Sequence, residues 1–518
     1  MVKFSANIKL EKRRGGSYLL VTSWPLYRNW RRSRALDLPI IVSPVSRGSL
    51  LQQALHSASV RQVLPTCIAG LPFIRLSRGS WTFREKFEIH DQCGRIFILV
   101  TPTSCELYVA DAFAAKQVLD RRADFLKPNK LLSRMEAFGQ NLATVDGDQW
   151  QRHHRLTRKA FHDKTYRTVW NEAYKQASLL FDRWNNTDIA NTQSDMVTLS
   201  LNILFKACFN LDDQGSVTEA DILSLQKHLE VYLRSLTGYP AQAFQAGESS
   251  RLVLSDFFTR LLETRKSSTE TESRNDLLSS MLSVTGQKTL SQSEIAGNLF
   301  FFIFAGHETT ASALVYITHL LAIFPHWQDW ASEEIDLVFS NHTTTDYQSL
   351  YPRLKRLHAL LYETLRLYGP VPTIVRIANN HSQTINTNND KFIIPANMPV
   401  NINAIAVHTD PDVWGDDCLD WNPGRWISPT GEELSPKFSK HFLSWGSGPR
   451  ICPGQRFSQI EVLAVLVCLL RSHRVSLVPD EGRTMQEARA QALHAIKSSS
   501  VGLTLRMPSV KVIRLIER

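Results

Sequence analysis

Cys452 lies in a loop whose composition suits it for presenting a reactive sulfur. Three glycines and two prolines surround it: Gly446, Gly448, Pro449, Pro453 and Gly454. Such a loop excludes helix and strand and allows backbone N–H groups to approach the sulfur closely. From Phe457 the sequence becomes apolar and helical, which places the sulfur near a helix N-terminus. Both features favour a thiolate, the form of cysteine that binds metals. The alternative is a buried structural cysteine.

A second group of polar residues interrupts the longest apolar helical pattern, from Ile295 to Leu321. The run Phe300–Phe304 makes this helix apolar on all sides, as expected for a helix buried in a core. Gly306, Glu308 and Thr309 follow within it, and the glycine alone destabilises a helix by about 1 kcal/mol. Residues that are unfavourable in a buried apolar helix usually mark a functional site. The alternative is a helix kink whose acid is satisfied internally.

The cysteine loop resembles the haem-binding loop of the cytochrome P450 family. The residues that carry the resemblance are Trp445, Gly448, Arg450, Cys452 and Gly454, with Trp445 at a position where the family usually has Phe. The resemblance implies that Cys452 is the axial thiolate of a haem iron. It also implies that Arg450 pairs with a haem propionate and that Trp445 covers the sulfur.

Two further segments supply candidates for binding the haem propionates by the same resemblance. Trp150 and, one helical turn later, His154 stand where the family has Trp and a basic residue. Arg152 and Arg155 are alternatives to His154 for this role, and a solvated basic helix face is the alternative for all three. Arg376 is the other propionate candidate.

The apolar helix matches the oxygen-activating segment of the family, in the residues Ala305 to Thr310. The resemblance implies that Gly306 opens a groove for O2, that Thr309 hydrogen-bonds the oxygen, and that Glu308 delivers protons from solvent. Phe301, Phe302, Phe304 and Ala305 are expected to face haem or substrate, and the alternative is that half of them are simply core residues.

Glu363 and Arg366 are spaced so that their side chains share one helix face, in a helix predicted to start near Leu354. This spacing is a weak signal alone. Its position between the apolar helix and the cysteine loop, together with the segment Trp421–Trp426, makes it stronger. The resemblance implies a buried ionic cluster of Glu363, Arg366 and Arg425 that holds the cysteine loop, which is a structural role.

Length and composition fit a single large enzyme. The chain has 518 residues, of which 43% are hydrophobic and 21% charged, and it can bury a large core. We predict a mainly α fold with small β-sheets (α+β), the cytochrome P450 fold, with an N-terminal extension at 1–38 and one catalytic domain at 39–518. A β-hairpin is expected over Gly94–Val109, followed by a helix that begins at Asp111. The seven scattered cysteines favour a reducing compartment.

The net charge of +10 is compatible with nucleic acid, an anionic membrane or an acidic partner. No basic run interleaved with aromatics supports nucleic acid. Basic residues cluster at Lys12–Arg14 and Arg28–Arg34 around an apolar stretch, Ser17–Tyr27, which is shorter than the roughly 20 residues of a membrane span. The Arg28–Arg34 cluster resembles the segment that follows the membrane anchor of eukaryotic family members, so either an anchor is shortened or missing here, or this segment lies on a membrane surface. The resemblance places that membrane contact at the cytosolic face of the endoplasmic reticulum, and the alternative is a flexible basic tail.

The expected activity is a haem-dependent monooxygenase that inserts one atom of O2 into an apolar organic substrate. The resemblance is to fungal and other eukaryotic microsomal members, with secondary metabolism as the expected setting. Electrons are expected from NADPH through a separate reductase with an acidic surface, because the chain shows no flavin domain or dinucleotide fingerprint. The substrate is not indicated, since the segments expected to select it carry no clear motif: Leu131–Ala143, Gln226–Gly247 and Lys497–Val501.

Three other functions would account for parts of this pattern. A haem-thiolate isomerase or dehydratase would use no O2, and the pair Glu308 and Thr309 argues against it. A haem sensor or scavenger would need no proton delivery, so the same pair disfavours it. A structural protein without haem would require all the matching segments to be coincidental.

Overall fold

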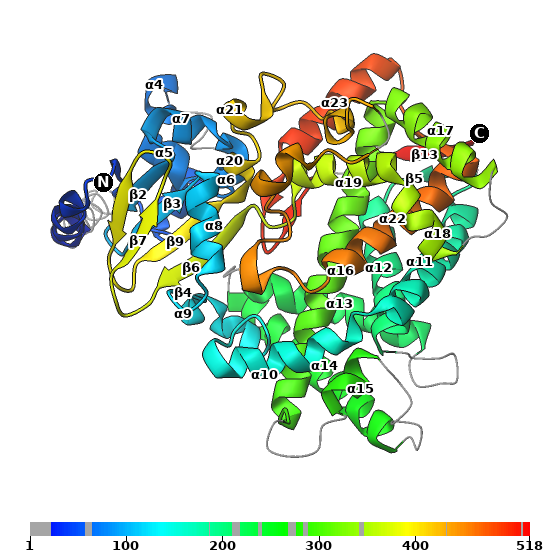
Figure 1. Cartoon of the computed structure of the whole chain (residues 1–518), viewed down its shortest axis with the longest axis horizontal. Helices are drawn as coiled ribbons and strands as arrows, with labels where there is room; N and C mark the ends of the chain where they lie inside the picture. The colour runs from blue at the N-terminus through cyan, green and yellow to red at the C-terminus, as the bar shows by residue number, and fades with distance from the viewer. Residues whose placement is uncertain are drawn as a thin grey trace, which may run out of the picture. The chain divides into compact units, whose positions relative to one another are not determined.

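The computed structural model describes residues 22–56, 65–185, 187–209, 218–236, 241–267, 276–282, 289–340, 346–430, 433–508 and 511–518 (Figure 1). The chain forms two compact units. The first comprises Met1–Pro128, Pro372–Cys418 and Gly446–Arg450, and the second comprises Asn129–Val371, Leu419–Trp445 and Ile451–Arg518. The predicted Lys12–Arg14 cluster and the start of the apolar stretch at Ser17 lie outside the described residues.

The first unit is built on a six-stranded mixed sheet with the strand order β1-β2-β3-β9-β6-β4. A two-stranded sheet of β7 and β8 accompanies it. A helix over 22–33 precedes η1. The elements of this unit are η1 (Arg34–Leu36), β1 (Ile40–Val42), α2 (Leu50–His56), α4 (Thr66–Ala69), α5 (Pro72–Ser77), α6 (Trp81–Glu85), α7 (Glu88–Cys93), β2 (Ile96–Val100), β3 (Cys105–Val109), α8 (Ala112–Asp120), β4 (Phe125–Leu126), β6 (Thr373–Ala378), β7 (Gln383–Asn386), β8 (Lys391–Ile394), β9 (Pro399–Asn403), α20 (Ala404–Val407), α21 (Pro411–Trp414) and η8 (Gly448–Arg450).

The predicted hairpin is confirmed as β2 and β3, which pair antiparallel from Ile96 opposite Val109 to Val100 opposite Cys105. Both strands are rich in β-branched and aromatic residues, which suit a pleated, buried surface. Asp111 caps α8 by accepting a hydrogen bond from the Ala114 N–H, so this predicted helix start is also confirmed. The core against the sheet consists of Ile41, Leu76, Trp81, Ile89, Phe97, Leu99 and Tyr108.

The second unit is mainly helical and carries two small sheets, β10-β13-β5 and β11-β12. Its elements are α9 (Asn129–Leu132), η2 (Ser133–Glu136), α10 (Gly147–Thr157), η3 (Arg158–Ala160), α11 (Asp163–Trp184), β5 (Asp188–Ile189), α12 (Thr192–Phe209), α13 (Glu219–Leu236), α14 (Ala241–Ser267), α15 (Leu277–Leu282), α16 (Gln292–Ile323), α17 (His326–Ser340), α18 (Tyr347–Leu350), η5 (Tyr351–Arg353), α19 (Lys355–Tyr368), η6 (Pro423–Trp426), η7 (Pro436–His441), α22 (Gln455–Ser472), β10 (His473–Leu477), α23 (Met485–Lys497), β11 (Ser500–Val501), β12 (Leu505–Arg506) and β13 (Ile513–Glu517).

The central helix of this unit is α16, which packs against α12, α19 and α22 (Figure 1). It begins at a capping box, in which the Ser291 hydroxyl accepts from the Glu294 N–H and the Glu294 carboxylate accepts from the Ser291 N–H. The predicted helix is confirmed and extends a few residues beyond both predicted ends. By length and hydropathy alone α16 could cross a membrane, but 78% of its most apolar window is buried inside the protein, as expected for a core helix.

The loop before α10 lies directly on α16 through two glycines. A Cβ on Gly297 would lie 2.3 Å from the Gly139 carbonyl oxygen, and a Cβ on Gly139 would lie 2.0 Å from the Ser293 carbonyl oxygen. Gly139 also has φ of +128°, where side chains are strained. The Asn298 side chain fixes the same loop by accepting from the Leu142 N–H at 2.9 Å. Only glycine at both positions permits this backbone approach.

Candidate functional site

The predicted cysteine loop and the helix after it are both present. The Cys452 N–H donates to the Trp445 carbonyl at 2.9 Å, and the Gln455 N–H donates to the Cys452 carbonyl at 3.2 Å. Helix α22 begins at Gln455, three residues after the cysteine. The Trp445 indole N–H donates to the Ser458 hydroxyl at 3.1 Å, so the ring is held by the first turn of that helix. The loop therefore presents Cys452 in a fixed backbone conformation.

The pKa of the Cys452 thiol is higher than the sequence analysis implied, since the loop composition indicated a favoured thiolate. Burial raises the pKa of the Cys452 thiol to about 11, while a hydrogen bond from the Gly454 backbone lowers it by a smaller amount. The predicted backbone donor is present, but desolvation outweighs it. A metal ion bound to the sulfur would favour the thiolate, because a coordinating thiol is deprotonated outright.

The predicted ionic cluster is confirmed at the end of α19. Glu363 and Arg366 are fully buried and form two hydrogen bonds of 2.8 Å. Glu363 also accepts from Arg425 Nε at 3.0 Å, the Trp426 indole at 2.9 Å and the Asn422 N–H at 2.8 Å. Five donors on one carboxylate satisfy its buried charge.

Aromatic rings connect this cluster to the cysteine loop. The ring of Trp426 lies 4.9 Å from that of Phe442, and Phe442 lies 5.7 Å from Trp445. The Ser444 hydroxyl also donates to the Leu365 carbonyl of α19 at 3.1 Å. The cluster and the segment that leads to Cys452 are thus packed as one body, which supports the structural role expected for the cluster.

Helix α16 leaves one stripe open in an otherwise buried surface. Phe301, Ala305 and Thr309, spaced four residues apart, are partly exposed, whereas Phe302 and Phe304 are buried in the core. Of the four residues expected to face haem or substrate, Phe301 and Ala305 lie in this stripe, whereas Phe302 and Phe304 are core residues, which was the alternative for half of them. Gly306 borders this stripe and faces α12, where a Cβ on Gly306 would lie 3.1 Å from a methyl carbon of Leu204. The stripe offers the apolar, accessible face that a porphyrin or an apolar substrate requires.

These features fit a haem. Among the described residues no three His, Cys, Asp or Glu side chains come together as a metal site, but a haem iron needs only one protein thiolate besides its porphyrin. Cys452 would supply the thiolate, and the open stripe of α16 would supply an apolar face.

The two predicted proton-handling residues bind different partners. The Thr309 hydroxyl donates to the Ala305 carbonyl at 2.7 Å, one turn back along α16. The buried Glu308 instead accepts from Thr504 Oγ1 at 2.7 Å and from Arg506 Nε at 2.8 Å. The Glu308 carboxylate therefore has hydrogen-bond donors within the protein, which was one of the two interpretations of the sequence. The sequence analysis did not identify these donors, Thr504 and Arg506.

On α10 the structure distinguishes between the basic candidates. The rings of Trp150 and His154 stack with centroids 4.8 Å apart, so the predicted one-turn spacing is confirmed. Arg152 forms an ion pair with Glu294 and donates to the Thr289 carbonyl at 3.2 Å, and Arg155 is exposed. His154 is therefore the basic residue that shares a face with Trp150, and its role toward a propionate stays a prediction.

A buried network between α10 and α16 was missed by the sequence reasoning. His153 lies 3.3 Å from Glu294 Oε1 through Nε2 and accepts from the Asn298 amide at 2.9 Å through Nδ1. Burial lowers the pKa of His153, so the ring is neutral and carries its proton on Nε2. The signal that could have identified His153 is its spacing of three from the apolar Trp150 and from Leu156.

Two remaining candidates belong to the first unit. Arg376 is buried on β6, where Nη1 donates to the Val375 carbonyl at 2.9 Å, and Arg450 ends η8. Gly448, also in η8, has φ of +71°, and a Cβ there would lie 2.7 Å from both the Leu119 carbonyl oxygen and Asp120 Oδ1. Glycine is therefore required at that position of the loop. The propionate roles of Arg376 and Arg450 stay predictions.

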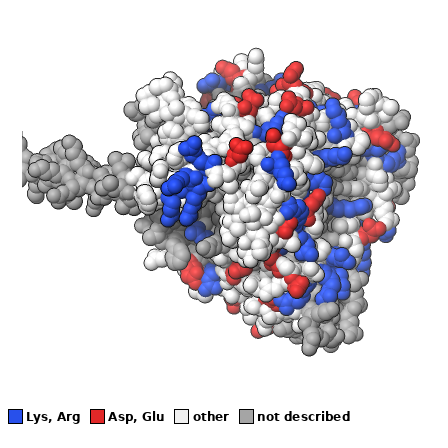
Figure 2. Space-filling model, turned by 60° about the vertical axis from the view of Figure 1, so that its left-hand side comes forward, with Lys and Arg blue, Asp and Glu red and all other residues white. Residues whose placement is uncertain are grey.

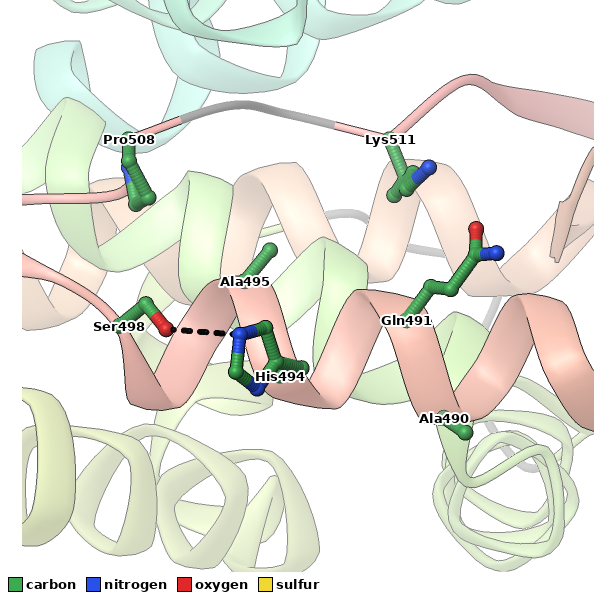
Figure 3. Close-up of a pocket in the computed structure, with 7 residues that line it drawn as sticks. All are labelled: Ala490, Gln491, His494, Ala495, Ser498, Pro508 and Lys511. Atoms are coloured by element: carbon green, nitrogen blue, oxygen red, sulfur yellow. Dashed lines mark hydrogen bonds between the residues drawn. The ribbon is translucent and has the colours of Figure 1, made fainter. Parts of the chain in front are cut away.

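A surface hollow of about 550 Å³ lies beside α23 and contains none of the predicted site residues (Figure 3). Its lining includes His494, whose Nε2 lies 3.4 Å from the Ser498 hydroxyl, and Lys511. Lys511 Nζ also donates to Asp480 at 3.4 Å. The hollow does not contribute to the candidate site.

A buried acid on α22 carries a consequence for stability. Glu461 is 1% exposed, and its Oε1 has no hydrogen-bond partner in the described chain. Burial raises the pKa of Glu461 to about 8, so the folded protein keeps a proton that the unfolded chain releases above its ordinary pKa of 4.5. The free energy of unfolding therefore falls as the pH rises from 4.5 to about 8.

We predict that Glu461→Gln removes this loss, because an amide stays neutral at every pH. The variant should gain about 1–4 kcal/mol relative to the parent between pH 5 and pH 9, as each pKa unit corresponds to about 1.4 kcal/mol. Denaturant unfolding at both pH values measures the change. The exposed Glu230→Gln serves as the control, and an equal pH slope in all three proteins would contradict the prediction.

The comparisons with known proteins agree with this geometry. The family model for Cytochrome P450 matches residues 73–502. A cytochrome P450 monooxygenase of Arthrobotrys oligospora is 26% identical over 95% of each chain. The phomenoic acid biosynthesis cluster cytochrome P450 monooxygenase of Leptosphaeria maculans is 29% identical over 88% of this chain and 90% of that protein. The 7-deoxyloganic acid hydroxylase of Catharanthus roseus is 25% identical over 72% of this chain and 75% of that protein. The chain therefore belongs to the cytochrome P450 family of haem-dependent monooxygenases.

Proposed function

We propose that this monooxygenase inserts one atom of O2 into an apolar organic substrate, while the second atom leaves as water. The observation that carries the proposal is the open stripe of α16, which places Thr309 at the end of an apolar face formed by Phe301 and Ala305. A hydroxyl next to an apolar face can orient oxygen beside a hydrophobic substrate. The relative named for the phomenoic acid biosynthesis cluster supports a setting in secondary metabolism.

In the proposed site each residue has a distinct task. When bound, the haem supplies the binding and reductive activation of O2. Cys452 would provide the thiolate that binds the iron, and Trp445, whose indole N–H is held by Ser458, would cover the sulfur. Thr309 holds a proton for the oxygen, and Glu308 exchanges protons with solvent. Trp150 and His154, with Arg376 and Arg450, would bind the propionates.

The proposed electron donor is a separate NADPH-dependent reductase with an acidic docking face. The chain carries a net charge of +10, and Figure 2 shows Lys and Arg side chains gathered in groups on one face, with Asp and Glu scattered between them. Opposite charge of this kind speeds association between partners.

The proposed location is the cytosolic face of the endoplasmic reticulum membrane. Trp24 is 67% exposed and Tyr27 is 49% exposed on the helix over 22–33, which also carries Arg28, Arg31 and Arg32. Exposed aromatics beside arginines suit a lipid headgroup region. The extension at 1–38 is proposed to make this contact, and the domain at 39–518 to carry the chemistry.

One experiment tests the function and the location together. The chain is produced in yeast, and the membrane fraction is examined by its reduced, carbon-monoxide-bound spectrum and by NADPH oxidation under ¹⁸O2 with an apolar probe such as 7-ethoxycoumarin. A thiolate-haem spectrum with ¹⁸O in the oxidised probe supports the proposal. Turnover without NADPH or O2 would indicate an isomerase or dehydratase, and haem binding without turnover would indicate a sensor. Recovery of the protein only in the soluble fraction would contradict the membrane location.

A further inference from the structure

A hairpin near the C-terminus covers one face of α16 over three successive turns. Glu308 binds Thr504 and Arg506, the Ser312 hydroxyl donates to the Leu505 carbonyl at 3.1 Å, and the Tyr316 hydroxyl donates to Ser499 at 2.7 Å. These three α16 residues are spaced four apart and therefore share one helix face. The hairpin is formed by β11 and β12, with Ser500 opposite Arg506.

This face of α16 is adjacent to the open stripe but separate from it. Successive residues on a helix point about 100° apart, so Glu308 and Thr309 project in different directions. Glu308 is directed at the hairpin and is 3% exposed, whereas Thr309 belongs to the partly exposed stripe. Thr309 bonds its own helix backbone rather than Glu308. Whatever orients the Glu308 carboxylate therefore determines how it exchanges protons with the neighbouring stripe.

Every hydrogen bond that the described chain makes to the Glu308 carboxylate is made to the same oxygen. Oε1 accepts from Thr504 Oγ1 and from Arg506 Nε, and Arg506 Nη2 lies 2.6 Å from it. In the described chain, two side chains lie within ion-pair distance of Glu308: those of Arg506 and His307. The His307 Nε2 atom is 4.0 Å from Glu308 Oε2. Burial lowers the pKa of His307, which favours the neutral ring, and its Nδ1–H donates to the Ile303 carbonyl at 2.5 Å.

We propose that Arg506 is a positioning residue for proton delivery: with Thr504 it fixes Oε1 of Glu308 and leaves Oε2 as the oxygen that exchanges protons. The Arg506 side chain is 37% exposed while that of Glu308 is 4% exposed, so the guanidinium lies between the buried acid and solvent. This inference rests on the proposed function of Glu308. It assigns Arg506 and Thr504 a role that they exert through Glu308.

The consequence appears in how the enzyme disposes of O2 when no substrate is present. O2 leaves as hydrogen peroxide after taking up two electrons and two protons, or as water after taking up four of each, and each NADPH supplies two electrons. Efficient proton delivery favours water. Loss of the positioned carboxylate therefore raises the hydrogen peroxide released per NADPH consumed.

The test compares Arg506→Gln, Arg506→Lys, Thr504→Val and Glu308→Gln, together with the double variant of Arg506→Gln and Glu308→Gln. Arg514→Gln is the matched control, because Arg514 also lies near the C-terminus and pairs with a carboxylate, Asp188, but at an exposed site where its side chain is 52% exposed. Each purified holoprotein is first checked by its reduced, carbon-monoxide-bound spectrum. The hydrogen peroxide released per NADPH is then measured with a reductase and no added substrate. The melting temperatures of the same variants give a second double-mutant cycle, which does not depend on turnover.

Arg506→Gln is expected to raise the peroxide yield at least about threefold with an unchanged spectrum. Arg506→Lys and Thr504→Val are expected to give smaller increases, since each retains part of the donor set. Adding Glu308→Gln to Arg506→Gln should cause little further change in peroxide yield or melting temperature, because both variants disrupt one interaction.

An unchanged peroxide yield in Arg506→Gln or Arg506→Lys, or additive effects in the double variant, would overturn the positioning role while leaving the monooxygenase assignment intact. If Arg506→Gln does not fold, the two milder variants decide the question by the same criterion. A wild-type protein without a thiolate-haem spectrum would overturn the proposed function itself, and this inference with it.

Discussion

Cys452→Ser is expected to abolish the thiolate-haem spectrum and to lower NADPH-dependent turnover by more than about 100-fold. This loss exceeds the one typical of mutating a residue that only hydrogen-bonds a metal ligand. Serine keeps the size of the side chain, but its hydroxyl does not ionise to a ligand as cysteine does. The loop should survive the change, because its backbone hydrogen bonds to Trp445 and Gln455 do not use the sulfur. The reduced, carbon-monoxide-bound spectrum of the purified variant measures the result.

Cys93→Ser is the appropriate control for this experiment. Cys93 is partly buried, as Cys452 is, and burial also raises the pKa of its thiol. It lies at the end of α7 and outside the glycine-rich loop. We expect its spectrum to match that of the parent protein. A thiolate spectrum that persists in Cys452→Ser, or that disappears in Cys93→Ser, would show that another residue ligates the iron.

Glu363→Gln is expected to have the second largest effect, on folding rather than on chemistry. The carboxylate balances the guanidinium groups of Arg366 and Arg425, whose side chains are 0% and 7% exposed. Removing one partner of a buried ion pair typically costs about 3–5 kcal/mol, because the other charge stays buried without compensation. This is a large fraction of the roughly 5–15 kcal/mol that stabilises a typical domain. We therefore expect little or no folded holoprotein.

The yield of haem-containing protein and its melting temperature measure this effect. Glu230→Gln is the control, since Glu230 also pairs with an arginine in the same unit but its side chain is 47% exposed, where an ion pair contributes little. The prediction is wrong if Glu363→Gln is produced and melts like Glu230→Gln. A folded variant with a normal melting temperature but no haem would instead indicate a direct role in the cysteine loop.

Local sequence signals account for most of the fold elements that position the site. Helix α16 could be located because its apolar run is long, although the predicted start at Ile295 overlooked the capping box at Ser291, three residues before the buried Glu294. The cysteine loop could be located because glycine and proline leave few other conformations. Glu363 and Arg366 share a helix face by spacing alone. These predictions depend on neighbours in the chain, and this is why they succeed.

The interactions that were missed join segments far apart in the chain. Arg506 and Thr504 reach Glu308 across almost two hundred residues, and no periodicity in either segment indicates the pairing. The elevated pKa of Cys452 was also not foreseen, because desolvation depends on the whole surrounding packing rather than on the loop sequence. Tertiary partners and burial are the properties that sequence spacing does not contain.

The contact between Gly139 and Gly297 limits how this enzyme can be redesigned. The segment Leu131–Ala143 is the part of the chain where changes of substrate preference would first be sought, yet its backbone touches α16 with no space for a single methyl group. A segment taken from a relative to replace this one must therefore have a glycine at the position that corresponds to Gly139. Within this segment, variation is confined to the residues on either side of Gly139, so a library of variants should leave both glycines unchanged.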